Sequence, residues 1–183
     1  MFYQGGSIAK YIVDVLQRIH PNFLRKFRIF FCDERFVPAS DKNSTYGVYK
    51  TALLPSPDIR ESHIVGINTN LTLKECAQDY EEKILKEFHL KAGEIPQFDI
   101  LFLGIGPDGH TCSLFPGHPA LKDTDRLVAA VDNSPKPPPQ RITMTFPLIR
   151  NAKCVMFVAL GEDKAEIVKV SIKEICFICF VTH

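Results

Sequence analysis

The sequence predicts a three-layer α/β/α fold, in which a mostly parallel sheet is covered by helices on both faces. Segments with apolar residues at helical spacing alternate along the chain with short apolar runs. Several of these runs are apolar at consecutive positions, which indicates strands that are buried on both faces. No internal repeat and no change of composition divides the 183 residues, so we expect a single domain over 1–183.

The first half of the chain contains two helix patterns and two strand patterns. Residues 7–20 carry apolar residues at helical spacing between Ser7, a suitable N-cap, and Pro21, which would end the helix. Residues 27–31 read FRIFF, an apolar run that is typical of a buried strand. Strands are therefore expected at 27–31 and 63–67, and helices at 7–20 and 44–54.

The second half continues the alternation. Residues 72–90 open with a capping box, Thr72 to Glu75, and carry an apolar stripe of helical period. Residues 98–104, FDILFLG, form the clearest buried strand, and the proline-rich residues 134–140 must be an exposed connection. Further strands are expected at 127–131, 141–146 and 153–161, and a last helix at 162–175.

Both ends of the chain differ from this regular pattern. The Gly5-Gly6-Ser7 turn would normally follow a strand, but only four residues precede it. The apolar residues 176–183 follow the last helix without a turn signal. Either the domain is incomplete at both termini, or these ends pair with something else.

Composition excludes several classes of function. The formal net charge is +1, which offers no general attraction for nucleic acid or an acidic membrane, so anions must be bound by locally placed Arg and Lys. Neither a signal peptide nor an apolar run long enough for a membrane helix is visible. Most of the six cysteines lie in apolar runs, which favours a reducing, cytoplasmic compartment, and no ligand pattern indicates a metal.

A glycine-rich loop, Gly104 to Gly109, follows the clearest strand and satisfies the pattern G-x-G-x-x-G. That pattern can bind a dinucleotide when it opens a long helix. Here the carboxylate of Asp108 would repel the phosphates, and Pro116 and Pro119 would interrupt the helix. The sequence therefore argues against a dinucleotide cofactor.

The same loop places Asp108 and His110 at the carboxyl end of a strand, where α/β proteins bind ligands. A carboxylate beside an imidazole fixes its tautomer and stabilises its protonated form. His110 is thus a candidate general base that Asp108 orients. The residue types leave a second interpretation open, in which His110 only caps the following turn.

Three blocks of the sequence resemble the glucosamine-6-phosphate isomerase/6-phosphogluconolactonase family, and they occur in the order expected for it. The blocks cover most of the chain and read FFCDERFVPASDKNSTYGVY, FDILFLGIGPDGHTCSLFPGHP and SPKPPPQRITMTFPLI. The residues of the last two blocks resemble those of the lactonase branch of this family. The resemblance implies a modified Rossmann-like fold of the glucosamine-6-phosphate isomerase type.

The resemblance also implies an activity, the hydrolysis of 6-phosphoglucono-δ-lactone to 6-phosphogluconate in the oxidative pentose phosphate pathway. His110 would take a proton from the attacking water and Asp108 would orient the ring. No cofactor and no metal are implied. The expected partner is the sugar phosphate lactone alone, with no nucleic acid and no membrane, bound by a monomer.

Four positions could hold the phosphate of the substrate according to the same resemblance. They are the Gly5-Gly6-Ser7 turn, Arg35, Arg141 and Lys164. Each has a simpler alternative. The turn could only cap a helix, Arg35 could pair with Asp33 or Glu34, and Arg141 and Lys164 could be solvated surface cations.

Two other functions remain open from the sequence. The first is isomerisation with deamination of glucosamine 6-phosphate, which uses the same phosphate grip. The second is a catalytically impaired form that binds sugar phosphate, because the ends of the chain depart from the family pattern.

Overall fold

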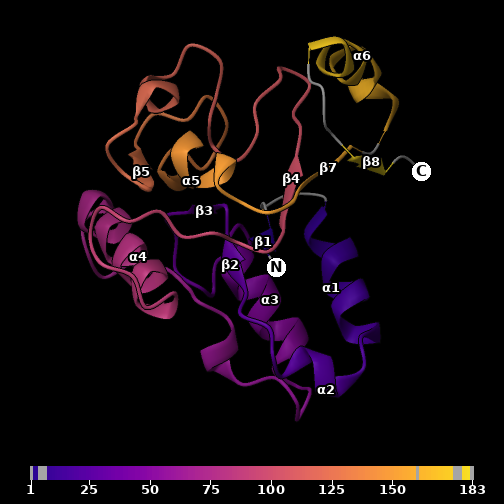
Figure 1. Ribbon diagram of the computed structural model, residues 1–183, viewed down its shortest axis with the longest axis vertical. Helices are drawn as coiled ribbons and strands as arrows, with labels where there is room; N and C mark the ends of the chain where they lie inside the picture. The colour runs from indigo at the N-terminus through magenta and orange to yellow at the C-terminus, as the bar shows by residue number, and fades with distance from the viewer. Residues whose placement is uncertain (1, 4–7, 160, 175–178, 182–183) are drawn as a thin grey trace.

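Five short parallel strands form the central sheet of the computed structural model, which describes residues 2–3, 8–159, 161–174 and 179–181. Their order across the sheet is β2-β1-β4-β7-β8 (Figure 1). The strands are β1 (Phe2–Tyr3), β2 (Phe30–Phe31), β4 (Leu101–Gly104), β7 (Val155–Val158) and β8 (Cys179–Val181). The expected parallel sheet is thus confirmed.

A second, antiparallel sheet stands beside the first and was not predicted. Its order is β3-β6-β5, with β3 at Asp33–Arg35, β5 at Val128–Val131 and β6 at Arg141–Met144. The connection between β5 and β6 contains no helix, so it cannot carry the chain across to a parallel neighbour. The register sets Arg35 opposite Arg141 and Asp33 opposite Thr143.

Four of the six α-helices in the described residues fall within predicted segments, whereas those at Pro21–Leu24 and Phe146–Arg150 were not predicted. Thr72 and Glu75 form the predicted capping box, because each side chain accepts the backbone N–H of the other. Ser44 caps α3 by accepting from the N–H of Gly47. The α-helices are α1 (Ile8–Arg18), α2 (Pro21–Leu24), α3 (Thr45–Leu53), α4 (Leu73–Glu87), α5 (Phe146–Arg150) and α6 (Ala165–Glu174). Three short 3₁₀ turns are η1 (Glu61–His63), η2 (Pro119–Lys122) and η3 (Glu162–Lys164).

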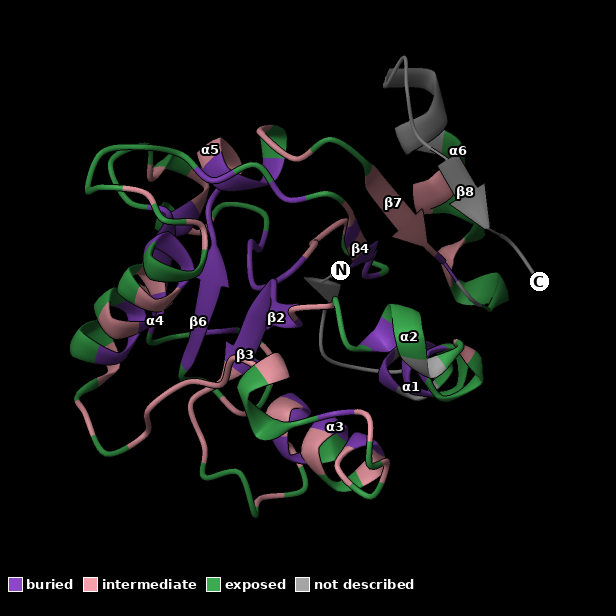
Figure 2. Cartoon of the chain, turned by 60° about the horizontal axis from the view of Figure 1, so that its bottom comes forward, coloured by how far each residue is buried: buried purple, intermediate pink, exposed green. Residues whose placement is uncertain are grey.

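Two apolar cores, one on each face of the parallel sheet, make the three layers. Phe30, Leu101 and Leu103 belong to the core under α4, whereas Phe31 and Phe102 belong to the core under α1 and α3. Consecutive strand residues point to opposite faces, so a continuous apolar run supplies both cores. Figure 2 shows the buried strands with α4 on one side and α1 and α3 on the other.

A strand stands ahead of the glycine turn, where the sequence predicts none. Residues Phe2 and Tyr3 form β1, which pairs in parallel with both β2 and β4. β8, in the segment after the last predicted helix, pairs with β7. The strand predicted at 63–67 is reduced to a single bridge between Ile29 and Ile64.

Tyr80 of α4 completes the backbone hydrogen bonding of β2. Its buried hydroxyl accepts from the N–H of Phe31 at 2.6 Å and donates to the carbonyl of Phe31 at 3.2 Å. A backbone donor and acceptor in the core are thus satisfied by one side chain. None of the described helices is both long and apolar enough to cross a membrane.

Candidate active site

The loop after β4 is held by its own hydrogen bonds. The N–H of Gly106 donates to the carbonyl of His110 at 2.8 Å, and the N–H of Gly109 donates to Gly106 at 2.9 Å. Thr111 Oγ1 donates to the carbonyl of Gly104 at 2.9 Å. The loop continues into bends and the short turn η2 rather than a helix, so the geometry that a dinucleotide needs is not formed here.

The Gly106 backbone is in close contact with the side chains of Asp108 and His110. A Cβ at this position would stand 2.1 Å from His110 Nδ1 and 2.6 Å from Asp108 Oδ1. Gly109 adopts a positive φ of 83°, which favours glycine. The two glycines therefore let an imidazole and a carboxylate pack against the loop backbone.

Asp108 and His110 contact each other, with 2.5 Å between Asp108 Oδ1 and His110 Nδ1. Partial burial raises the pKa of Asp108, but hydrogen bonds from His110 and Lys136 outweigh it and lower that pKa. Because the ionised carboxylate carries no hydrogen, the bonding pattern assigns the proton to Nδ1. Nε2 is then the acceptor nitrogen of the ring. The predicted contact is present, and the catalytic role of the pair stays a prediction.

Phe115 connects His110 with the buried arginine of β6. The imidazole stacks on the Phe115 ring with centroids 4.5 Å apart, and the Arg141 guanidinium lies 5.7 Å from the same centroid. The His110 side chain is 13 % exposed, so the ring is packed on one face and still reaches solvent. The structure thus brings His110 and Arg141 to one site.

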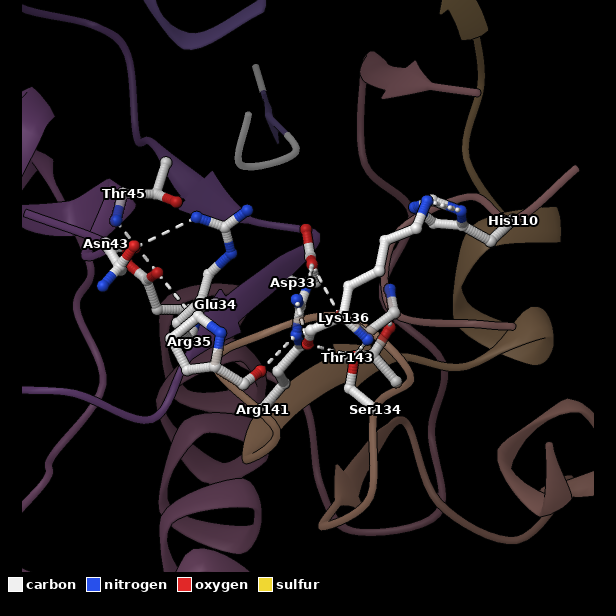
Figure 3. Close-up of polar contacts among 12 residues, drawn as sticks. Asp33, Glu34, Arg35, Asn43, Thr45, His110, Ser134, Lys136, Arg141 and Thr143 are labelled. Atoms are coloured by element: carbon white, nitrogen blue, oxygen red, sulfur yellow. Dashed lines mark hydrogen bonds and ion pairs between the residues drawn. The ribbon is translucent and has the colours of Figure 1, made fainter. Parts of the chain in front are cut away.

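Arg141 is committed to the proline-rich connection 134–140. Its Nε donates to the carbonyl of Pro138 at 3.0 Å, and its Nη2 donates to those of Lys136 at 2.9 Å and Pro137 at 3.2 Å. Nη1 faces Asp33 Oδ2 at 3.9 Å. Burial lowers the pKa of Arg141, although Asp33 opposes the effect. The guanidinium therefore anchors this loop, and its predicted phosphate contact stays a prediction (Figure 3).

Arg35 stands opposite Arg141 across the two antiparallel strands. Its Nη1 donates to the carbonyl of Asn43 at 3.0 Å, while its buried Nε has no hydrogen-bond partner. Like charges at directly opposed positions of a sheet repel each other. A bound anion would relieve that repulsion and supply the acceptor that Nε lacks.

Glu34 caps the first turn of α3 from inside the protein. Its carboxylate accepts from the backbone N–H groups of Arg35 at 2.8 Å, Thr45 at 3.0 Å and Tyr46 at 2.5 Å. Burial raises the pKa of Glu34 to about 7, even though these three N–H groups lower it. The sequence left open a pairing of Glu34 with Arg35. The contact that the structure shows between them is the hydrogen bond from the Arg35 backbone N–H.

Lys136 is a charged site residue that the sequence analysis did not identify. Its Nζ lies 3.3 Å from Asp108 Oδ1 and 3.3 Å from His110 Nδ1. The sequence shows it within the rigid connection 134–140, where prolines would hold a side chain in place. The rigidity of this connection was the one feature of the sequence that could have pointed to Lys136, but it does not indicate which residues the side chain contacts.

Of the remaining predicted phosphate ligands, the structure describes Lys164 but not the Gly5-Gly6-Ser7 segment. Lys164 ends η3, just after β7, which neighbours β4 in the sheet. It is half-buried, and because β7 runs parallel to β4, η3 follows β7 at the same edge of the sheet at which the His110 loop follows β4. Gly5, Gly6 and Ser7 fall outside the described residues. Within the described part of the chain, no group of three or more His, Cys, Asp or Glu side chains is arranged to hold a metal ion.

Comparisons with known proteins agree on one family. Residues 1–175 match the family described as "Glucosamine-6-phosphate isomerases/6-phosphogluconolactonase". The human "6-phosphogluconolactonase" is 49 % identical over 169 residues, which cover 90 % of this chain and 65 % of the relative. A Drosophila melanogaster "Probable 6-phosphogluconolactonase" is 47 % identical over 167 residues, with the same two coverages.

Solved structures agree with the sequence matches. The 6-phosphogluconolactonase of Trypanosoma brucei superposes with a TM-score of 0.80 at 28 % identity, over 100 % of this chain and 83 % of that chain. That of Leishmania guyanensis gives 0.79 at 28 % identity, over 92 % and 72 %. The chain spans about 65 % of the length of the curated relatives from human and Drosophila.

Proposed function

This chain belongs to the glucosamine-6-phosphate isomerase/6-phosphogluconolactonase family, and from that premise we propose that it hydrolyses 6-phosphoglucono-δ-lactone to 6-phosphogluconate. The observation that carries the proposal is the Asp108–His110 pair, with 2.5 Å between Oδ1 and Nδ1 at the carboxyl end of β4. Similar proteins named 6-phosphogluconolactonase support the choice of substrate.

The reaction needs one proton carrier, and His110 can supply it. Nε2 takes a proton from water as the water oxygen bonds to the lactone carbonyl carbon. Asp108 stabilises the imidazolium that forms, because its carboxylate already accepts from Nδ1. The tetrahedral intermediate then collapses, the bond from the carbonyl carbon to the ring oxygen breaks, and His110 returns the proton to that oxygen.

A phosphate grip would hold the lactone in place for this attack. Arg35 is the best supported ligand, because its buried Nε has no hydrogen-bond partner and its neighbour across the strands is another cation. Lys164 and the Gly5-Gly6-Ser7 turn complete the proposed grip, and Arg141 contributes its charge from behind. A guanidinium can bind two phosphate oxygens at once.

We also propose the domain organisation, compartment and partners of the enzyme. Residues 1–183 form one lactonase domain that acts as a cytoplasmic monomer, without a cofactor, a nucleic acid or a membrane partner. The near-neutral composition and the free thiols of Cys32, Cys76, Cys112 and Cys154 support this setting.

A direct assay tests the function. The purified chain should release protons from 6-phosphoglucono-δ-lactone faster than spontaneous hydrolysis does, and it should release no ammonia from glucosamine 6-phosphate. His110→Ala should lower turnover by at least about a hundredfold, the usual contribution of a general base.

A second histidine provides a matched control. His118 is half-buried, its Nε2 lies 2.7 Å from Asn133 Oδ1, and its Nδ1 accepts from the N–H of Ala120 at 3.1 Å as the cap of η2. His118→Ala should keep the turnover of the parent. A folded parent chain that does not accelerate lactone hydrolysis, or that releases ammonia, would overturn the proposal.

A further inference from the structure

We propose that Lys136 is a positioning residue that keeps His110 in its unprotonated, proton-accepting form and locks the Asp108–His110 pair in place. This inference rests on the proposed function, because it assigns Lys136 a role in lactone hydrolysis. Figure 3 shows the Lys136 side chain extending from the Arg141 region toward the ring of His110.

The contacts of the ammonium group carry the inference. Lys136 Nζ lies 3.3 Å from Asp108 Oδ1 and 3.3 Å from His110 Nδ1. Asp108 Oδ1 therefore receives two donors, the imidazole N–H and the ammonium. When Nε2 also binds a proton, the ring becomes a second cation directly beside Lys136, and the two repel each other.

Asp108 and Lys136 thus act on His110 in opposite directions. The carboxylate alone would favour the protonated ring, which cannot accept a proton from water. The ammonium offsets this effect while it leaves the hydrogen bond between Asp108 and Nδ1 in place. The ring keeps its orientation and remains a base.

The backbone of Lys136 is held by hydrogen bonds with the side chains of Ser134 and Arg141. Its carbonyl accepts from Arg141 Nη2 at 2.9 Å and from Ser134 Oγ at 2.9 Å. The carbonyls of Pro137 and Pro138 accept from the same guanidinium at 3.2 and 3.0 Å. Buried Arg141 therefore places the lysine, and part of the ordering cost of its side chain is met before substrate binds.

Stability alone does not explain this arrangement. The side chains of Lys136 and Asp108 are 44 % and 40 % exposed, and exposed ion pairs contribute little to folding. The ammonium nevertheless lies against the one imidazole that the mechanism uses. Its effect is expected on the proton affinity of that ring rather than on the fold.

The charged groups around His110 come from several elements. Asp108 belongs to the same loop, and Lys136 reaches in from the connection 134–140. Arg141 of β6 lies behind Phe115, with Asp33 of β3 beyond it. The η3–α6 segment carries Lys164 and approaches the loop, because a Cβ on Gly109 would lie 3.2 Å from Ile167 Cδ1. The Lys136 ammonium lies 3.3 Å from the imidazole Nδ1, whereas the Arg141 guanidinium contacts the Phe115 ring.

The test compares Lys136→Met with Lys136→Arg over a range of pH. For Lys136→Met, the acid limb of the kcat/KM profile should move about one pH unit upward, and activity well below that limb should fall about tenfold. Activity on the alkaline side should remain near that of the parent. Lys136→Arg should restore the acid limb, because it restores the cation.

A control and a substrate-free readout complete the experiment. Lys153 also pairs with an aspartate, with 2.7 Å from its Nζ to Asp99 Oδ1, but it lies outside the site. Lys153→Met should therefore leave the acid limb of the kcat/KM profile unchanged. The NMR signal of the His110 ring should titrate at higher pH in Lys136→Met than in the parent. An unchanged acid limb, an unchanged NMR midpoint, or an equal loss of activity at every pH would overturn the inference.

The two readouts separate this inference from the proposed function. If the parent chain does not hydrolyse the lactone, the proposed function fails. The NMR titration still decides whether Lys136 controls protonation of His110, because it requires no substrate.

Discussion

Replacing Asp108 with asparagine tests the central contact of the site while keeping the shape of the side chain. The carboxylate accepts from His110 Nδ1 at 2.5 Å and from Lys136 Nζ at 3.3 Å. The amide of asparagine carries no charge to stabilise the imidazolium. It can also present its NH₂ group to the ring, which would favour the wrong tautomer.

The size of the effect follows from these contacts. A hydrogen bond to a charged group contributes about 1.5–3 kcal/mol. Because the Asp108 side chain is 40 % exposed, we take the lower part of that range, about 1.5–2 kcal/mol. At about 1.4 kcal/mol for each factor of ten, Asp108→Asn should reduce kcat about 10- to 30-fold. KM should change little, because the carboxylate is not a phosphate ligand.

The assay is the rate of proton release from the lactone, measured with Asp108→Asn and Asp99→Asn in parallel. Asp99 pairs with Lys153 at 2.7 Å and its side chain is 80 % exposed, so the same substitution there should leave kcat unchanged. A loss below about threefold in Asp108→Asn, or an equal loss in both variants, would refute this account of the site. A change confined to KM would also refute it.

Three further predictions concern the fold and the phosphate grip. Tyr80→Phe should lower the free energy of unfolding by about 1–3 kcal/mol, since it leaves the buried N–H and C=O of Phe31 without their hydroxyl partner; urea unfolding measures this, and an unchanged midpoint would contradict it. Burial raises the pKa of Glu34 to about 7, so its stabilising contribution is present at low pH and is lost as the pH rises through 7. The unfolding free energy of the parent relative to Glu34→Gln should therefore fall by about 2–3 kcal/mol between about pH 5 and pH 8.5, and a constant difference would show that Glu34 does not titrate there. Arg35→Met should raise KM about tenfold or more with kcat retained, and should weaken inhibition by inorganic phosphate; unchanged values for both would remove Arg35 from the grip.

The parts of the fold that depend on short stretches of chain could be read from the sequence. The capping box at Thr72 and Glu75 marks the start of α4, and the apolar residues 98–104 contain β4. The glycine-rich loop brings Asp108 and His110 together, since the two are only two residues apart. Such features are determined within one or two turns of backbone, where local sterics and hydrogen bonding decide.

Contacts between distant parts of the chain could not be read in this way. The residue type of Arg141 suggests a phosphate ligand, but its hydrogen bonds to the carbonyls of residues 136–138 depend on the register of β3 and β6 and on the path of that loop. Lys136 meets His110 across 26 positions of the sequence, and Tyr80 meets Phe31 across 49. Neither pairing follows from spacing or composition.

The sequence by itself determined the starts of α3 and α4, the apolar strand β4 and the loop that joins a carboxylate to an imidazole, because each depends on neighbouring residues. Only the tertiary structure decided which cations face that imidazole and which are buried as anchors. Those choices depend on strand order and register, which are set by the packing of the whole sheet against its helices.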